Sequence, residues 1–145
     1  MKSSLTEGLK HSFSFKVPAT KTVPSLYPES PHLRAMPEVF ATGFMVGLME
    51  WTCMQLLEQH LDEGEGSLGV HIDVSHTAAT PVGFTVTVEV ECIELRGLCA
   101  KFKVRAHDGV DEIGSGIHDR FIVQWDRFNK RVGAKSARMS SEATV

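Results

Sequence analysis

A single charged residue lies within a long apolar segment near the middle of the chain. Glu50 is the only charge between Val39 and Leu57, and its neighbours are helix formers or bulky apolar residues. Because apolar side chains point almost all the way round, the pattern is typical of a helix buried on most faces. A carboxylate in such a place is costly unless it is paired or takes part in chemistry. We therefore expect Glu50 inside the protein, facing a partner or a substrate.

The helix has a predicted start and a proline-rich segment before it. Met36-Pro37-Glu38 indicates a first turn that contains proline, so a helix is predicted from about Pro37 to Leu61. Residues 18–37 carry repeated prolines, which exclude a helix and favour a long ordered loop or lid. Loops of this length in compact domains tend to be functional.

Five segments show the alternation of apolar and polar residues expected of half-buried strands. They cover residues 13–17, 69–78, 84–95, 98–107 and 112–125. Gly114 and Gly116 inside the last segment indicate a bulge or a close backbone approach. One strand, one buried helix and consecutive antiparallel strands form an α+β layout.

A sheet that wraps one central helix is the hot-dog fold. Since the helix is apolar on more faces than one small sheet can cover, we expect a dimer with continuous sheets. Residues 1–128 are predicted to form this domain, and residues 129–145 a polar, basic tail that is flexible, either frayed or helical.

Composition narrows the class of protein. A chain of 145 residues with a formal charge of -3 is one ordinary domain, and that charge argues against nucleic acid or an anionic membrane as the main partner. The apolar run from Val39 to Met49 is too short to span a bilayer, and the first residues lack the apolar core of a signal peptide. Three cysteines without paired spacing favour a reducing, cytoplasmic location.

Two further residues are candidates for chemistry with Glu50. Strand alternation places His76 on the same face as Val70, Ile72 and Val74, and such a lone histidine is more often a satisfied core residue than a catalytic one. A second buried titratable group, Glu50, makes a functional pair more plausible. Thr42 precedes Glu50 by roughly 12 Å along a helix and about 80° of rotation, so both can line one cleft. The common alternative for Thr42 is a hydrogen bond to its own helix backbone.

Two other motifs give less information about function. Residues 64–69 match G-x-G-x-x-G, but a helix precedes the motif and a strand follows it, the reverse of a dinucleotide site. Gly64 or Gly66 is instead predicted to cap the helix, which leaves a backbone N–H at Gly69 for a ligand. The acidic residues of 107–112 fit a hairpin turn, and no metal site is predicted.

Long blocks of the chain resemble the fluoroacetyl-CoA thioesterase family, which belongs to the hot-dog thioesterases. The blocks include Leu26-Tyr-Pro-Glu-Ser-Pro31, the segment from Pro37 to Trp51, His76-Thr-Ala-Ala-Thr-Pro81 and the segment from Ala106 to Gly116, and the resemblance extends from about residue 17 to 128. It implies a homodimer that hydrolyses a toxic acyl-CoA, a detoxification reaction.

The resemblance also assigns roles to residues. Thr42, Glu50 and His76 fall on the family's catalytic positions, and Gly69 and Arg120 on its substrate-contacting positions. The proline-rich segment up to Met36 corresponds to a lid over the acyl pocket. The family carries aromatic residues where this chain has Leu33 and Met36, which implies a more flexible lid and a fluorine preference open to test.

The expected activity is therefore hydrolysis of a short acyl-CoA, fluoroacetyl-CoA or a similar one, without a cofactor beyond the CoA of the substrate. Glu50 acts as nucleophile or as general base, and the sequence leaves both roles open. A hot-dog acyl-CoA hydratase or dehydratase, and a non-catalytic acyl-CoA binding protein, are the alternatives.

Overall fold

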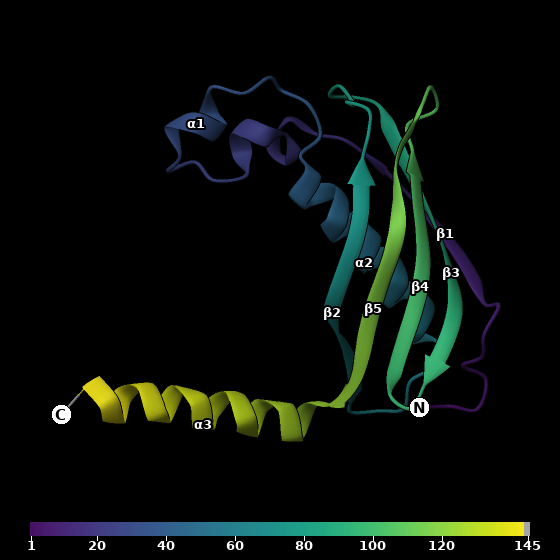
Figure 1. Ribbon diagram of the computed structural model, residues 1–145, viewed down its shortest axis with the longest axis vertical. Helices are drawn as coiled ribbons and strands as arrows, with labels where there is room; N and C mark the ends of the chain where they lie inside the picture. The colour runs from purple at the N-terminus through teal and green to yellow at the C-terminus, as the bar shows by residue number, and fades with distance from the viewer. Residues whose placement is uncertain (144–145) are drawn as a thin grey trace.

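The computed structural model describes residues 1–143, and the side chains up to residue 140. A curved antiparallel sheet wraps around one long helix (Figure 1). The sheet has the order β1-β3-β4-β5-β2, with strands β1 (Lys10–Lys16), β2 (Glu65–His76), β3 (Thr85–Arg96), β4 (Cys99–His107) and β5 (Glu112–Gln124). The central helix is α2 (Thr42–Glu58). This arrangement confirms the predicted α+β hot-dog fold.

The core lies between α2 and the concave face of the sheet. Alternate residues of β3 and β4 are fully buried, as their period-two pattern predicts. They pack on α2 residues that are also buried; the largest members of the cluster are Phe40, Met45, Met49, Leu57, Phe102 and Ile113. Burial of Cys53 in the same cluster raises the pKa of its thiol to about 12, so the thiol behaves as a small apolar group.

Helix α2 is shorter than predicted at both ends. It begins at Thr42 instead of Pro37, because Val39 and Phe40 have extended backbone and pair with other segments: Phe40 N–H donates to the Thr80 carbonyl at 2.8 Å. It ends at Glu58, with Gln59 as the C-cap, so neither Gly64 nor Gly66 caps it. Gly64 turns the chain with a φ of 82°, and Gly66 lies in β2 directly against the Trp125 indole.

The segment between β1 and α2 forms the expected lid-like excursion, but the prediction that its prolines exclude a helix is wrong, because Pro31 lies in the first turn of a short α-helix. The segment contains three short helical turns, η1 (Ala19–Lys21), η2 (Val23–Ser25) and α1 (Pro31–Arg34), and it projects beyond the N-terminal end of α2 (Figure 1). Leu26 anchors it, since a Cβ at Gly43 of α2 would lie 3.2 Å from the Leu26 Cδ1 atom. The lid therefore contacts the first turn of the central helix.

Strand β2 forms one edge of the sheet and carries a bulge. Its pairing with β5 shifts between Gly69 and His71, so one extra residue is inserted there. Val70 and Ile72 remain 58% and 40% exposed beside it. Without the bulge, Gly69 and His76 would point to opposite faces, because they are an odd number of residues apart.

The glycines of β5 make the close approaches predicted for them. A Cβ at Gly116 would collide with the Asp73 carbonyl oxygen of β2, and a Cβ at Gly114 would lie 2.8 Å from the Met45 sulfur of α2. The two glycines let β2 and α2 lie directly against β5, which brings the residues of the next subsection together.

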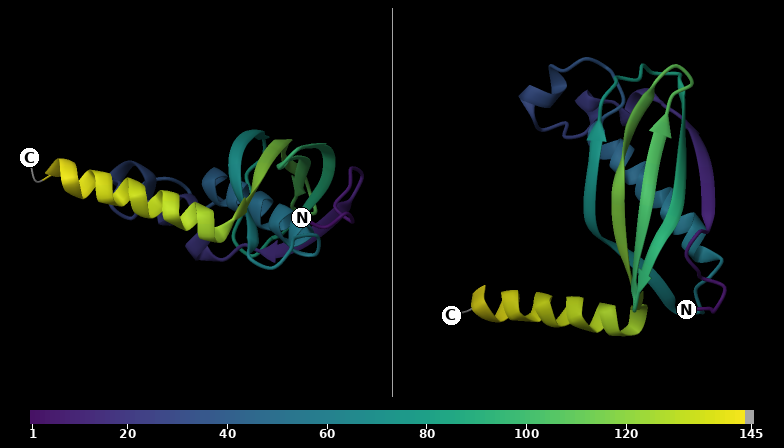
Figure 2. Two further views of the ribbon diagram at one scale, coloured as in Figure 1. Left: turned by 90° about the horizontal axis from the view of Figure 1, so that it is seen from below. Right: turned by 45° about the vertical axis from the view of Figure 1, so that its right-hand side comes forward.

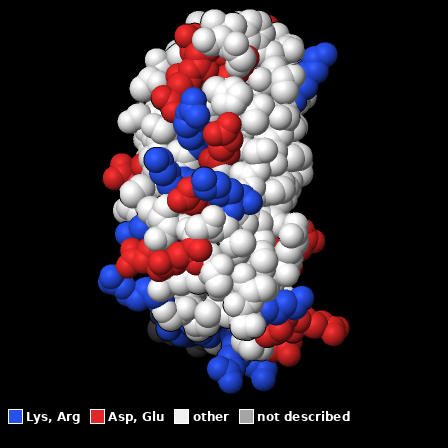
Figure 3. Space-filling model, turned by 90° about the vertical axis from the view of Figure 1, so that its right-hand side faces the viewer, with Lys and Arg blue, Asp and Glu red and all other residues white. Residues whose placement is uncertain are grey.

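The face over β1, β3 and β4 interleaves charges of both signs (Figure 3), with ion pairs such as Arg105 Nε to Glu112 at 2.6 Å and Lys10 to Glu91 at 3.5 Å. The last helix, α3 (Trp125–Ala143), leaves the sheet and extends away from it (Figure 2). The predicted domain boundary at residue 128 thus falls in its first turn. No helix within residues 1–143 is long and apolar enough to cross a membrane.

Candidate active site

Glu50 lies on α2 beside two basic residues of β5. Its Oε1 atom accepts a hydrogen bond from Arg120 Nη1 at 3.2 Å and lies 3.9 Å from His118 Nε2. The Glu50 side chain keeps 39% of its surface exposed. It is therefore half-buried, whereas the sequence predicted an enclosed side chain. The reason is that it faces the edge strand β2, which no further strand within residues 1–143 covers.

The Arg120 side chain is almost completely buried, so Arg120 is not a solvent-exposed cation on the surface of β5. Its Nε donates to Ser67 Oγ at 2.8 Å and its Nη2 to the Ser67 carbonyl at 2.9 Å. Burial lowers the pKa of Arg120, and the Glu50 carboxylate acts in the opposite direction. The guanidinium is therefore held on both sides and directed at Glu50.

Gly69 is in contact with the same carboxylate. A Cβ at this position would collide with Glu50 Oε1 and lie 3.1 Å from His118 Cε1. Only glycine leaves the carboxylate where it is. Together with Val46, His71 and Ile72, these residues line an open pocket of about 360 Å³ at the β2 edge.

Thr42 and His76 form a second cluster. Thr42 is the first residue of α2 and His76 the last residue of β2, and Thr42 Oγ1 lies 2.7 Å from His76 Nδ1. The threonine thus bonds to the histidine, not to its own helix. Burial lowers the pKa of His76, with the backbone at Ala78 acting in the opposite direction. Its Nε2 atom is buried and has no hydrogen-bond partner among the residues that the structure describes.

The two clusters are separate within one chain. They lie about two helical turns apart on α2, roughly 12 Å along the axis, and no hydrogen bond or ion pair among the described residues joins Glu50 to His76. The sequence predicts that Thr42 and Glu50 line one cleft. Within one chain, Glu50 instead lies with Gly69 and Arg120, and Thr42 lies with His76.

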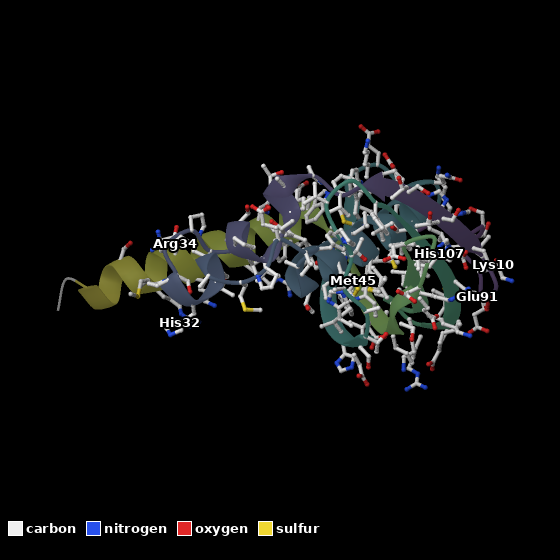
Figure 4. The ribbon with its side chains drawn as sticks, turned by 90° about the horizontal axis from the view of Figure 1, so that it is seen from above. Lys10, His32, Arg34, Met45, Glu91 and His107 are labelled. Atoms are coloured by element: carbon white, nitrogen blue, oxygen red, sulfur yellow. The ribbon has the colours of Figure 1, made fainter. Side chains whose placement is uncertain are left out.

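The lid residues lie further out. Leu33 is half-buried in α1 and Met36 is 48% exposed. His32 and Arg34, which flank Leu33, lie well away from the sheet, whereas Met45 of α2 is buried next to it (Figure 4). The lid carries its own N-cap, a hydrogen bond from Leu33 N–H to Ser30 Oγ at 3.2 Å.

Sequence reasoning missed His118 and Ser67. Their signal was available in part: His118 and Arg120 alternate with buried Ile122, so the period-two pattern places all three on the inward face of β5. Ser67 carried no comparable signal. Within residues 1–143, no cluster of histidine, cysteine and acidic residues is arranged to hold a metal ion.

A curved antiparallel sheet around one long central helix defines a protein of the hot-dog class. A thioesterase superfamily member from Thermus thermophilus, 24% identical, shares the fold with a TM-score of 0.86 over 96% of this chain and 98% of that one. The profile of the fluoroacetyl-CoA-specific thioesterases matches residues 17–126, and the chain belongs to this family of thioester hydrolases.

Closer relatives agree with this assignment. The chain is 52% identical to the fluoroacetyl-CoA thioesterase of Streptantibioticus cattleyicolor over 136 residues, which cover 94% of this chain and 98% of that protein. A solved structure of a fluoroacetyl-CoA thioesterase superposes with a TM-score of 0.90 at 52% identity, over 92% of this chain and 98% of that one. Another structure of that enzyme, a variant, holds fluoroacetate and CoA.

Proposed function

We propose that this protein hydrolyses fluoroacetyl-CoA, or an acyl-CoA of similar size, to the free acid and CoA. The observation that carries the proposal is the Glu50 carboxylate, which Arg120 holds at 3.2 Å and which lines an open pocket beside Gly69. The chain's membership of the fluoroacetyl-CoA-specific family supports the choice of substrate. No cofactor is needed beyond the CoA of the substrate.

Glu50 attacks the thioester carbon or activates a water molecule for that attack. Either route breaks the carbon–sulfur bond and adds the elements of water, releasing an acid and a thiol. Thr42 orients the substrate and stabilises the oxyanion, with Gly69 as a second contact. His76, held by Thr42 at 2.7 Å with Nε2 free, transfers a proton to the leaving thiolate or from the water. We assign Arg120 to the thioester end of the substrate, because a buried guanidinium suits that end better than the phosphates of CoA.

We further propose that two copies of the chain complete the site. Val70 and Ile72 expose apolar surface on the unpaired edge strand β2, where a second β2 can add antiparallel. Pairing centred near Ile72 places Gly69 of one copy opposite about residue 75 of the other. The Glu50 cluster of one copy then meets the Thr42–His76 cluster of its partner. Three free cysteines, two of them buried, support a cytoplasmic location for this dimer.

The test is thiol release from fluoroacetyl-CoA and acetyl-CoA side by side, with several longer acyl-CoAs. We expect turnover of fluoroacetyl-CoA, and a loss of at least roughly 10²-fold in Glu50→Ala and in His76→Ala with the fold retained. Absence of thiol release would contradict the proposal. Interconversion of enoyl and hydroxyacyl thioesters would then identify a hydratase, and binding of intact acyl-CoA a binding protein.

A further inference from the structure

His118 is a buried histidine in contact with the Glu50 cluster. It lies on β5 with 1% of its surface exposed, and its Nδ1 atom is 2.7 Å from the His71 carbonyl oxygen of β2. A carbonyl oxygen only accepts hydrogen bonds, so Nδ1 carries the proton. This bond fixes both the tautomer and the plane of the ring.

The other ring nitrogen is the acceptor for Arg120. His118 Nε2 lies 3.2 Å from Arg120 Nη1, and because a guanidinium has donors only, Nε2 holds a lone pair and the imidazole is neutral. The same Nη1 atom donates to Glu50 Oε1 at 3.2 Å. Ser67 binds the opposite side of the guanidinium through Nε and Nη2. His118 and Ser67 together determine where Arg120 presents its N–H groups to Glu50.

We propose that His118 is a positioning residue for the hydrolysis, whose neutral ring holds Arg120 Nη1 against Glu50 and whose protonation at acid pH releases Arg120 and switches the site off. This role rests on the proposed function of Glu50. In this role His118 acts through Arg120.

The charges around His118 set the sign of the pH dependence. Burial lowers the pKa of His118 below its ordinary value of 6.5, and the Arg120 cation acts in the same direction. The His71 carbonyl, Glu50 of α2 and Asp119 of β5 oppose this effect without reversing it. The thiol of Cys53 on α2 stays neutral, and β4 contributes Phe102, which has no titratable group. The ring is therefore neutral above pH 6.5, and it becomes a second cation beside Arg120 as the pH falls through its lowered pKa.

Two variants of similar size separate the two hydrogen bonds. His118→Gln places an amide oxygen near the position of Nε2, so it keeps an acceptor for Arg120 and cannot titrate. His118→Asn keeps a donor toward His71 and lacks the acceptor. At pH 8 we expect His118→Gln to retain kcat within about three-fold and His118→Asn to lose roughly ten-fold or more in kcat, with a smaller change in KM.

The pH–rate profile tests the switch itself. The acid limb of kcat should move to lower pH in His118→Gln, and stay in place in the control His107→Gln, which removes a half-exposed histidine near Glu89. Equal kcat in the Gln and Asn variants, or an acid limb that His118→Gln leaves unmoved, would overturn the proposal.

Nitrogen NMR of the ring gives a readout that does not depend on activity. Protonation on Nδ1, with a pKa below 6.5, is the expected result, and a ring protonated on Nε2 at neutral pH would overturn the proposed hydrogen bond. Absence of thiol release from the unmodified protein would instead contradict the proposed hydrolysis, while the tautomer of His118 is read in either case.

Discussion

The position of one carboxylate depends on the absence of one methyl group. Gly69 faces Glu50 so closely that a Cβ would collide with Oε1. We expect Gly69→Ala to displace the carboxylate from Arg120 and to lower kcat by about ten-fold or more, because small misplacements of a catalytic group are costly. The measurement is thiol release, with circular dichroism to verify the fold.

Gly47→Ala is the matched control for this substitution. Gly47 lies one turn before Glu50 on α2, and a Cβ there meets nothing within 4 Å. In a helix interior, alanine is favoured over glycine by roughly 0.5–1 kcal/mol, so the variant should be as active and slightly more stable. Full activity of Gly69→Ala would show that the carboxylate tolerates the displacement.

Sequence reasoning finds residues whose environment is visible along the chain. Glu50 stands out because its apolar neighbours are consecutive, and His76 because strand alternation places it among valines and an isoleucine. The hydrogen bonds that Arg120 donates to Glu50 and to Ser67 join residues 70 and 53 positions apart. Such contacts depend on strand register, which local patterns do not determine.

At the scale of elements, the alternation of apolar and polar residues in β3 and β4 predicts the boundaries of these strands to within a residue or two. The pattern is clear because one face of each strand is buried and the other faces solvent. The start of α2 was mispredicted because Val39 and Phe40 pair with other segments, and tertiary pairing outweighs the helix signal of Pro37. The bulge after Gly69 had no signal in the local pattern, yet it turns Gly69 and His76 to the same side of the sheet.

The lid carries Leu33 and Met36 at positions where the family resemblance predicts aromatic residues. We expect Met36→Phe, alone and with Leu33→Phe, to raise the ratio of kcat/KM for fluoroacetyl-CoA over acetyl-CoA several-fold, because a stiff ring closes the acyl pocket with less freedom than methionine. The control is Tyr27→Leu, which changes a lid residue that is 61% exposed. A ratio that stays constant in the aromatic variants would assign substrate selection to residues outside the lid.

We expect the part of α3 beyond Phe128 to be dispensable for folding. Trp125 packs on Gly66 of β2 and makes an edge contact with Phe128 at 5.9 Å between ring centroids, and beyond Phe128 the helix extends away from the sheet (Figure 1). We propose that residues 1–128 are the folding unit. Deleting residues 129–145 should leave the melting temperature within about 4 °C, whereas Trp125→Ala should lower it by more, as thermal denaturation can measure. A deletion that unfolds the protein would assign the helix to the domain.

At the scale of the whole molecule, the separation of the two clusters in one chain gives a direct test of the proposed dimer. Glu50→Ala and His76→Ala should each be inactive alone. If each site takes Glu50 from one copy and His76 from its partner, a mixed dimer of the two variants contains one intact site. Equal mixing with exchange makes half of the dimers mixed, so the mixture should recover about a quarter of the unmodified activity. Thiol release is measured after the variants are unfolded and refolded together, with separately refolded variants as the control. A mixture as inactive as its components, in a preparation that is dimeric by light scattering, would place Glu50 and His76 of the same chain in one site.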